Sequence, residues 1–311
     1  MNNVNSLEIE LLRNNYVESK HKIFIATNKD EVGFDFFPRS AIKPFQIVPL
    51  IALASKSNIK FDSDEIAIFG SSHSGQDMHL NLLKKISKKY EINWDEIFCA
   101  PQRPMHIKTA DNYISQKLPF IKLHNNCSGK HLSMLIYSKL LKADNNNYQS
   151  IDHVVQKNIN KFFKEIFEIN EIYYGIDGCG LPAIYLNSRS FLKGVKNILL
   201  SEYKDIWLSI FNSYYSHPDL VGGENRTDTN IMINSSTPLL AKSGAEGVLF
   251  ATDNKTSYLF KCLDGNFRAV DLVATYELLK QEFVNEIPYK KLVDNYSRNL
   301  QNTEVYSFNI I

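Results

Sequence analysis

The sequence predicts an α+β fold in which strands from both ends of the chain form one antiparallel sheet around a mostly helical region. Two β-rich runs near the N-terminus, Lys20–Thr27 and Val32–Phe37, are separated by a short polar turn and predict a hairpin. Gly247–Thr252 and Ser257–Leu263 flank a second polar turn near the C-terminus. Between these hairpins the apolar residues recur mainly at helical spacing. Strands and helices therefore do not alternate as they do in a parallel α/β fold.

The first expected helix covers Arg39–Ser55 and starts beside Pro38. Glu65–Phe69 reads as a short buried strand that ends at a polar, glycine-containing cluster. Another helix follows, because apolar residues from Met78 to Tyr90 recur at helical spacing with lysines on the opposite face. Further helices are expected in these segments: Ser128–Leu141, Ile151–Phe167, Phe191–Leu199, Tyr203–Tyr215 and Ala269–Phe283.

Composition and charge exclude several classes of protein. The 311 residues include 35 Lys+Arg and 34 Asp+Glu, so no basic excess is present to bind nucleic acid or an anionic membrane. The longest apolar stretch, around Ile47–Ala54, contains Pro49 and is too short to cross a bilayer. Met1–Glu10 is polar and does not resemble a signal peptide, so we expect a cytoplasmic protein. We expect a single domain over 1–311, with mainly sheet in 1–70 and 238–311 and mainly helices in 71–237.

The segment Ser40-Ala41-Ile42-Lys43 contains a candidate nucleophile and a candidate base. Residues three apart share a helical face, so the Lys43 amine can reach the Ser40 hydroxyl. A serine needs a neighbouring base at neutral pH, and a lysine serves when burial or another cation lowers its pKa. Taken alone, the pattern more often describes a helix-capping serine beside a surface lysine.

Two later motifs change this interpretation. Ser72-His73-Ser74-Gly75 follows a predicted strand, and Lys242-Ser243-Gly244 precedes the late hairpin. The chain therefore carries S-x-x-K, S-x-S and K-S-G in order, as β-lactamases and penicillin-binding proteins carry S-x-x-K, S-D-N and K-T-G. A second lysine would hold a substrate carboxylate and lower the pKa of the first. Together the motifs favour a catalytic site over isolated turn and surface residues.

The cysteines suggest a second site. Cys127 and His131 are four apart and share a helical face, while Cys179 lies in a glycine-flanked turn. Two thiolates and a nitrogen ligand suit Zn²⁺, and spacing alone favours His131 as that ligand. The spacing matches no common zinc motif, so buried thiols, or a nucleophilic Cys127 with His124 or His131 as base, remain alternatives. Asp177 could pair with an ammonium group of a ligand.

Taken together, the motifs resemble the thermolabile, rhizobial-type L-asparaginase II family. The pair H-N-N-C-S-G-K-H and D-G-C-G is highly specific. The matching segments are collinear and cover most of the chain: Val17–His21, Pro38–Pro44, Ser72–Gly75, His124–His131, Asp177–Gly180, His217–Thr229 and Lys242–Gly247. The resemblance implies a serine β-lactamase-like fold and hydrolysis of L-asparagine to L-aspartate and ammonia. The chain departs from the family in a shorter stretch between His21 and Pro38.

The resemblance implies two catalytic pairs, Ser40 with Lys43 and Ser72 with Lys242. We expect Ser40, deprotonated by Lys43, to attack the side-chain amide carbon of L-asparagine while backbone N–H groups hold the oxyanion. Water then cleaves the β-aspartyl ester, and Ser72 and Lys242 relay protons. Ser72 activated by Lys242 is the alternative nucleophile.

The resemblance also implies ligand-binding residues. Zinc is expected on Cys127, Lys130 and Cys179, where the metal must displace a proton from the lysine. The serine–lysine chemistry does not require this zinc. Residues on the substrate side are Arg39, His131 and Asp177. A homodimer is expected, because the family forms homodimers.

Other functions stay open from the sequence. A penicillin-recognising acyltransferase shares the chemistry, but Ser74 replaces the asparagine of S-D-N and such an enzyme acts outside the cytosol. A glutaminase or another acyl-serine amidase is hard to distinguish from an asparaginase by sequence. The side chains of glutamine and asparagine differ by one methylene group, which a pocket usually discriminates by only ~1–3 kcal/mol. A non-enzymatic zinc-binding scaffold leaves Ser40, Lys43 and Lys242 without a role.

Overall fold

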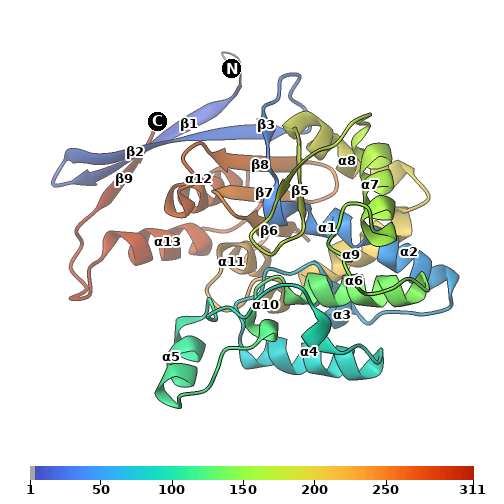
Figure 1. Ribbon diagram of the computed structural model, residues 1–311. Coiled ribbons are helices and arrows are strands. Elements are labelled where there is room, and N and C mark those ends of the chain that lie inside the picture. The colour runs from blue at the N-terminus through green and yellow to red at the C-terminus, as the bar shows by residue number, and fades with distance from the viewer. Residues whose placement is uncertain (1–3) are drawn as a thin grey trace.

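The computed structural model describes residues 4–311 and contains a large twisted sheet against which the helices pack (Figure 1). The sheet has six strands in the order β6-β7-β8-β2-β1-β9, and each neighbouring pair is antiparallel. Its strands are β1 (Ser6–Arg13), β2 (Tyr16–Thr27), β6 (Leu240–Gly244), β7 (Val248–Thr252), β8 (Ser257–Cys262) and β9 (Ser307–Ile310). The two ends of the chain therefore share one antiparallel sheet, which is compatible with the predicted α+β class.

The late hairpin is confirmed, because β7 pairs with β8, but the prediction for the early hairpin is wrong. β2 pairs instead with β1, through a turn in which Asn14 and Asn15 both have positive φ (47° and 67°). Such a turn matches the strand twist, and asparagine tolerates its left-handed backbone. The apolar character of Val32–Phe37 has another cause, since Phe34 and Phe36 are buried in the core. A second sheet has the order β3 (Asp35–Phe36), β5 (Pro182–Asn187), β4 (Tyr173–Ile176).

Most predicted helices are confirmed within a few residues of their expected ends. The α-helices are α1 (Lys43–Gln46), α2 (Val48–Lys56), α3 (Ser63–Phe69), α4 (Asp77–Lys89), α5 (Ile107–Ser115), α6 (Ser128–Leu140), α7 (Val154–Phe167), α8 (Ser188–Leu200), α9 (Lys204–Ser216), α10 (Pro218–Val221), α11 (Thr227–Ile233), α12 (Phe267–Lys280) and α13 (Ile287–Ser297). Short 3₁₀ segments are η1 (Arg39–Ile42), η2 (Trp94–Glu96) and η3 (Lys122–His124). Across residues 4–311, every helix is too short or too polar to span a bilayer.

Two predicted elements differ from the structure. Glu65–Phe69 belongs to helix α3 and is not a strand, because Asp62 and Glu65 form a reciprocal capping box at its start. All of its residues from Glu65 onward are buried, so the sequence shows no periodicity that separates helix from strand. The expected helix over Arg39–Ser55 is divided into η1, α1 and α2. Pro44 and Pro49 each lie in the first turn of a new segment, where the missing N–H group leaves no bond unmade.

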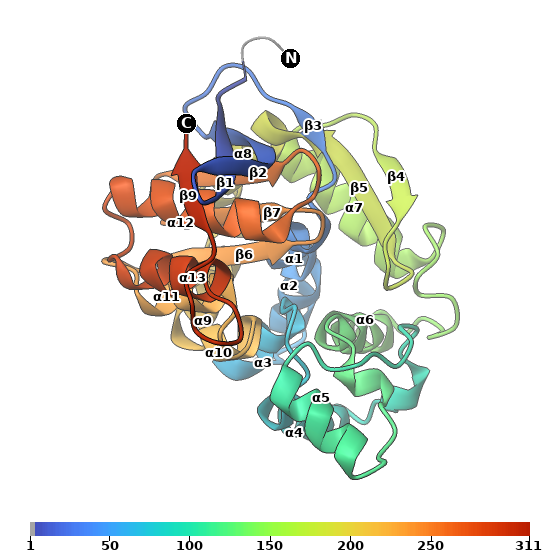
Figure 2. The same ribbon diagram turned by 90° about the vertical axis from the view of Figure 1, so that its left-hand side faces the viewer.

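Helices cover the end of the sheet that carries β6, as the turned view shows (Figure 2). Every residue of β6 and β7 is buried, so both faces of the sheet are covered there. η1 packs directly on β6, because a Cβ atom at Gly244 would lie 2.5 Å from the carbonyl oxygen of Pro38. The start of α6 approaches the end of α3 as closely, since a Cβ atom at Gly129 would lie 2.1 Å from the Ile68 carbonyl oxygen. These two glycines bring four distant segments of the chain together.

Candidate active site

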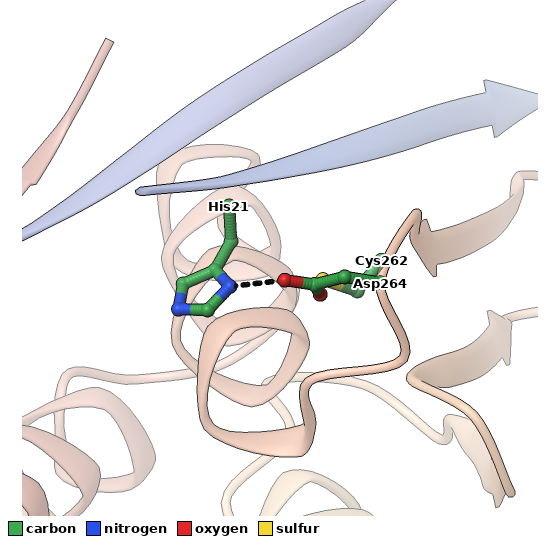
Figure 3. Close-up of side chains that lie close together, drawn as sticks. All are labelled: His21, Cys262 and Asp264. Atoms are coloured by element: carbon green, nitrogen blue, oxygen red, sulfur yellow. Dashed lines mark hydrogen bonds and ion pairs between the residues drawn. The ribbon is translucent and has the colours of Figure 1, made fainter. Parts of the chain in front are cut away.

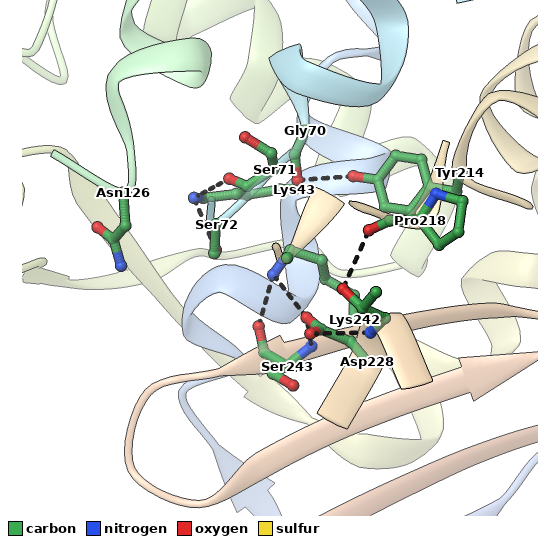
Figure 4. A network of polar contacts seen from close by, with 12 residues as sticks. Lys43, Gly70, Ser71, Ser72, Asn126, Tyr214, Pro218, Asp228, Lys242 and Ser243 are labelled. Carbon is green, nitrogen blue, oxygen red and sulfur yellow. Dashed lines mark hydrogen bonds and ion pairs between the residues drawn. The ribbon is translucent and has the colours of Figure 1, made fainter. Parts of the chain in front are cut away.

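The predicted serines and lysines lie where η1, α1, β6 and the loop after α3 meet, and Figure 4 shows three of them, Lys43, Ser72 and Lys242. Ser40 lies in η1, Lys43 begins α1, Ser72 lies in the loop after α3, and Lys242 lies in β6. Arg39, directly before Ser40, has a φ of 51°. A non-glycine residue in this region of φ is strained, and such strain gathers at functional sites.

Lys43 is the centre of one polar network. Its side chain is buried, and its Nζ atom donates hydrogen bonds to the backbone carbonyl of Ser71 and to the Ser72 Oγ atom at 3.0 Å (Figure 4). The Cys127 Sγ atom lies 3.4 Å from the same nitrogen. Burial lowers the pKa of Lys43; the charge of Lys130 reinforces this shift, and the Cys127 sulfur opposes it. A lysine with a lowered pKa is thus in hydrogen-bond contact with a serine hydroxyl.

Lys242 is the centre of a second network. Its Nζ atom donates to the carbonyl oxygen of Ser243 at 2.8 Å and lies 3.6 Å from Oδ2 of Asp228 (Figure 4). Both charged side chains are completely buried. Burial lowers the pKa of Lys242 to about 7, and Lys43 contributes in the same direction, whereas Asp228 opposes the shift. This amine therefore exchanges its proton near neutral pH.

The serine–lysine contacts differ from the expected pairs. Ser72 contacts Lys43, whereas Lys242 is bonded to Ser243 and Asp228. Within residues 4–311, the Ser40 hydroxyl forms no hydrogen bond to either amine under a 3.5 Å limit. The Ser40–Lys43 contact was expected from their spacing of three residues, and the Ser72–Lys242 pair from the family resemblance alone.

Both serines open onto one cavity of about 310 Å³. This volume is at the small end of the range for ligand sites in proteins. Its wall also contains Gly244 and Ala245 at the end of β6, together with residues from α11, α12 and α13. A small polar substrate can thus approach the two hydroxyl groups from this space.

The three predicted zinc ligands form a buried cluster beside Lys43. The Lys130 Nζ atom lies 3.3 Å from the Cys179 Sγ atom, and Lys130, Cys127 and Cys179 are each buried. A hydrogen bond from Cys179 holds the pKa of Cys127 well below its usual value and raises that of Cys179. Burial alone would lower the pKa of Lys130, but the nearby sulfurs raise it. The three groups therefore shift one another's pKa values strongly.

The donor set of this cluster fits zinc. Tetrahedral zinc with typical bond lengths separates a sulfur and a nitrogen ligand by about 3.6 Å. The observed separation of 3.3 Å between Lys130 and Cys179 is close to this value. Zinc binding would require the loss of protons from Lys130 and Cys179.

The predicted substrate-side residues lie next to this cluster. Arg39 Nη2 is 2.9 Å from Oδ1 of Asp177, so these two side chains neutralise each other. His131 is buried, with Nδ1 2.5 Å from the Tyr148 hydroxyl, and burial holds its pKa well below the usual value. In the described part of the chain, Arg39, His131 and Asp177 are not among the residues lining the cavity that contains both serines. Their role in binding substrate stays a prediction.

The structure adds site residues to which the sequence reasoning gave no role. Asp228 is the buried partner of Lys242, and Arg226 and Asp271 line the cavity. Arg226 and Asp228 lie in His217–Thr229, one of the segments that carry the resemblance, but no chemical role follows from that segment. Asp271 had no signal, because it is a single acidic residue inside a helix of mostly apolar, buried residues.

Another polar cluster connects β2 to the turn after β8 (Figure 3). Asp264 accepts hydrogen bonds from His21 Nδ1 at 2.6 Å and from the Cys262 thiol at 2.9 Å. In residues 4–311, these three form the one group of His, Cys, Asp and Glu whose ligand atoms lie mutually within 4.8 Å. Burial, and then the bond to Asp264, raise the pKa of Cys262 to about 12, so the thiol keeps its proton. The cluster therefore connects the sheet to the start of α12 through hydrogen bonds.

Comparison with protein families gives one match. The model of the family described as L-asparaginase II matches residues 9–307, which include every site residue discussed above. The comparison with curated proteins found no match.

Proposed function

This chain belongs to the L-asparaginase II family and is an L-asparaginase, and from that premise we propose that it works through an acyl-enzyme formed on Ser40. The observation that carries this mechanism is the 3.0 Å contact between Lys43 Nζ and Ser72 Oγ, beside the cavity that Ser40 also lines. A nucleophile and a base in one water-restricted site are the minimum for such chemistry. The proposal revises the expected pairing, because Lys43 acts through Ser72.

In the proposed reaction, the Ser40 oxygen attacks the side-chain amide carbon of L-asparagine. The Ser40 proton passes to the Ser72 oxygen as the Ser72 proton passes to the neutral Lys43 amine. Backbone N–H groups around Ser40 and the end of β6 hold the oxyanion. The C–N bond then breaks, and the leaving nitrogen takes a proton to depart as ammonia. Water attacks the ester, and its two hydrogens end on Ser40 and the enzyme base as L-aspartate forms.

Lys242 has a different task in this proposal. Its pKa of about 7 suits an amine that gains and loses a proton in each cycle. Asp228 holds Lys242 in place through the buried ion pair between them (Figure 4).

We also propose a serine β-lactamase-like fold. Its support is that η1, the loop after α3 and β6 carry S-x-x-K, S-x-S and K-S-G in chain order around one cavity. β6, which carries K-S-G, is an edge strand of the antiparallel sheet. An experimental structure compared with serine β-lactamases tests this assignment.

For zinc, we propose Cys127, Lys130 and Cys179 as the ligands. The metal would supply a fixed positive charge beside Lys43 and so favour its neutral form. Metal analysis of the purified protein and of Cys127→Ser tests this assignment, with about one zinc expected in the first and none in the second. The expected homodimer is tested by light scattering.

Covalent labelling shows whether Ser40 or Ser72 is the nucleophile. The diazoketone analogue of L-asparagine alkylates a nucleophilic hydroxyl, and peptide mass spectrometry then identifies the modified residue. We expect modification of Ser40 in the native enzyme, slower modification of Ser40 in Ser72→Ala, and none in Ser40→Ala. Modification of Ser72 would overturn the assignment. Ammonia release from L-asparagine and L-glutamine, measured beside it, defines the amide preference.

A further inference from the structure

The cavity has two charged residues at the end formed by α11, α12 and α13. Arg226 precedes α11 as its N-cap residue, and Asp271 lies in α12. In residues 4–311, neither of them belongs to an ion pair with a nitrogen–oxygen distance of 4.0 Å or less. Two opposite charges thus face the same space without pairing to each other.

Arg226 is available to an anion. Its Nε atom is buried and has no hydrogen-bond partner in the described residues. An unbonded, buried guanidinium nitrogen is unfavourable, because the group has lost its contacts with water. The buried Nε atom is not exposed to the cavity, so a carboxylate there would be held by the terminal N–H groups of Arg226, whose fork matches the two carboxylate oxygens.

Asp271 is available to a cation. Its carboxylate accepts a hydrogen bond from the Tyr296 hydroxyl at 3.2 Å, and Thr227 provides another. These neutral groups orient the carboxylate but do not compensate its charge. Burial raises the pKa of Asp271 to about 6, although the charge of Arg226 opposes this shift, and this agrees with a carboxylate that has no cation within ion-pair distance.

We propose that this end of the cavity binds the α-amino acid group of L-asparagine, with Arg226 holding the α-carboxylate and Asp271 holding the α-ammonium. The inference rests on the proposed function, because it places the side-chain amide at Ser40 and Ser72. A zwitterion supplies one negative and one positive group, which is what the two unpaired side chains require. Arg39 and Asp177 are less suited, since they already neutralise each other at 2.9 Å.

Two shortened amides separate the roles of the charges. Succinamate is L-asparagine without its α-amino group, and 3-aminopropanamide is L-asparagine without its α-carboxylate. Asp271→Asn should raise the KM for L-asparagine about 10- to 100-fold and leave kcat/KM for succinamate unchanged. Arg226→Met should also raise the KM for L-asparagine about 10- to 100-fold, and it should leave kcat/KM for 3-aminopropanamide unchanged.

Matched controls remove charges elsewhere. Arg268→Met on α12 and Asp294→Asn on α13 delete a cation and an anion outside the cavity lining, and both should keep the wild-type KM. Arg39→Met and Asp177→Asn test the competing pair. If Arg226→Met or Asp271→Asn prevents folding, Arg226→Lys and Asp271→Glu keep the charges. Each of these should raise the KM for L-asparagine. Arg226→Lys should leave kcat/KM for 3-aminopropanamide unchanged, and Asp271→Glu should leave kcat/KM for succinamate unchanged.

The outcomes distinguish this inference from the proposed function. No ammonia from L-asparagine with the wild-type enzyme would refute the function itself. An active enzyme in which the Arg226 and Asp271 variants keep the wild-type KM would refute the inference alone. If Arg39→Met and Asp177→Asn instead raise the KM for L-asparagine and leave kcat/KM for the matching shortened amides unchanged, that pair binds the α-amino acid group.

Discussion

Asp228→Asn tests whether a buried carboxylate sets the pH at which Lys242 works. The two side chains are fully buried and 3.6 Å apart. Unit charges at this distance interact by about 5 kcal/mol at an effective dielectric constant of about 20, and one pKa unit corresponds to about 1.4 kcal/mol. Loss of the negative charge should therefore lower the pKa of Lys242 by about 3 units from its value of about 7. The substituted amide keeps an acceptor oxygen for the Ser243 N–H group, which lies 3.2 Å from Oδ2.

The assay is the pH dependence of kcat for ammonia release from L-asparagine. In the wild-type enzyme kcat should fall as the pH drops below about 7, because Lys242 becomes protonated. In Asp228→Asn this decrease should move to lower pH by up to about 3 units. Lys43, Arg226 and Cys127 also act on Lys242, but the substitution leaves them unchanged. Asp219→Asn, an exposed acid of α10, is the control. Identical profiles for the wild type and Asp228→Asn would refute the assignment of Lys242 as the titrating group.

Three further substitutions test the site. Lys43→Met should lower kcat by roughly 10²–10⁴-fold, because it removes a general base. It should not lower the melting temperature, since burial disfavours the charged form of this lysine. Near-full turnover would exclude Lys43 as the base. Added zinc at 100 times its Kd should stabilise the apoprotein by about 2.7 kcal/mol in urea unfolding, and an equal gain in Cys179→Ser would contradict the proposed ligands. Asp271→Asn should be more stable than the wild type by about 1–3 kcal/mol at pH 8, because the folded-state pKa of about 6 exceeds the unfolded value and the ionised form is disfavoured. This difference should vanish below pH 4, and its persistence there would show that charge is not the cause.

Local patterns predicted the helices well. The helix α4 follows from apolar residues at helical spacing opposite lysines, and its observed range is Asp77–Lys89. The strand β1 was missed although Leu7, Ile9 and Leu11 alternate with polar residues, because the segment was assessed only as a possible signal peptide. β9 is short and partly exposed, so its sequence contains little that distinguishes it from a loop. The first hairpin was assigned to the wrong partner because buried Phe34 and Phe36 resemble a strand.

The residues of the site were more predictable than their contacts. Motif order identified Ser40, Lys43, Ser72 and Lys242, and the structure places them in one region. The contact between Lys43 and Ser72 joins residues 29 positions apart, and no local rule gives it. The partner of Lys242 likewise depends on how α11 packs on β6. Such contacts arise from tertiary packing, so propensity and spacing alone do not predict them.

The antiparallel pairing of β1 with β9 has a consequence for synthesis of the chain. Ile9 faces Ile310, so β1 leaves the ribosome long before β9, the strand that covers its outer edge. During that interval, the exposed edge can pair with a neighbouring nascent chain. Lys242 also emerges late, and until then the two serines lack their second amine. Newly made molecules should thus stay inactive and prone to aggregation until both Lys242 and β9 have been translated.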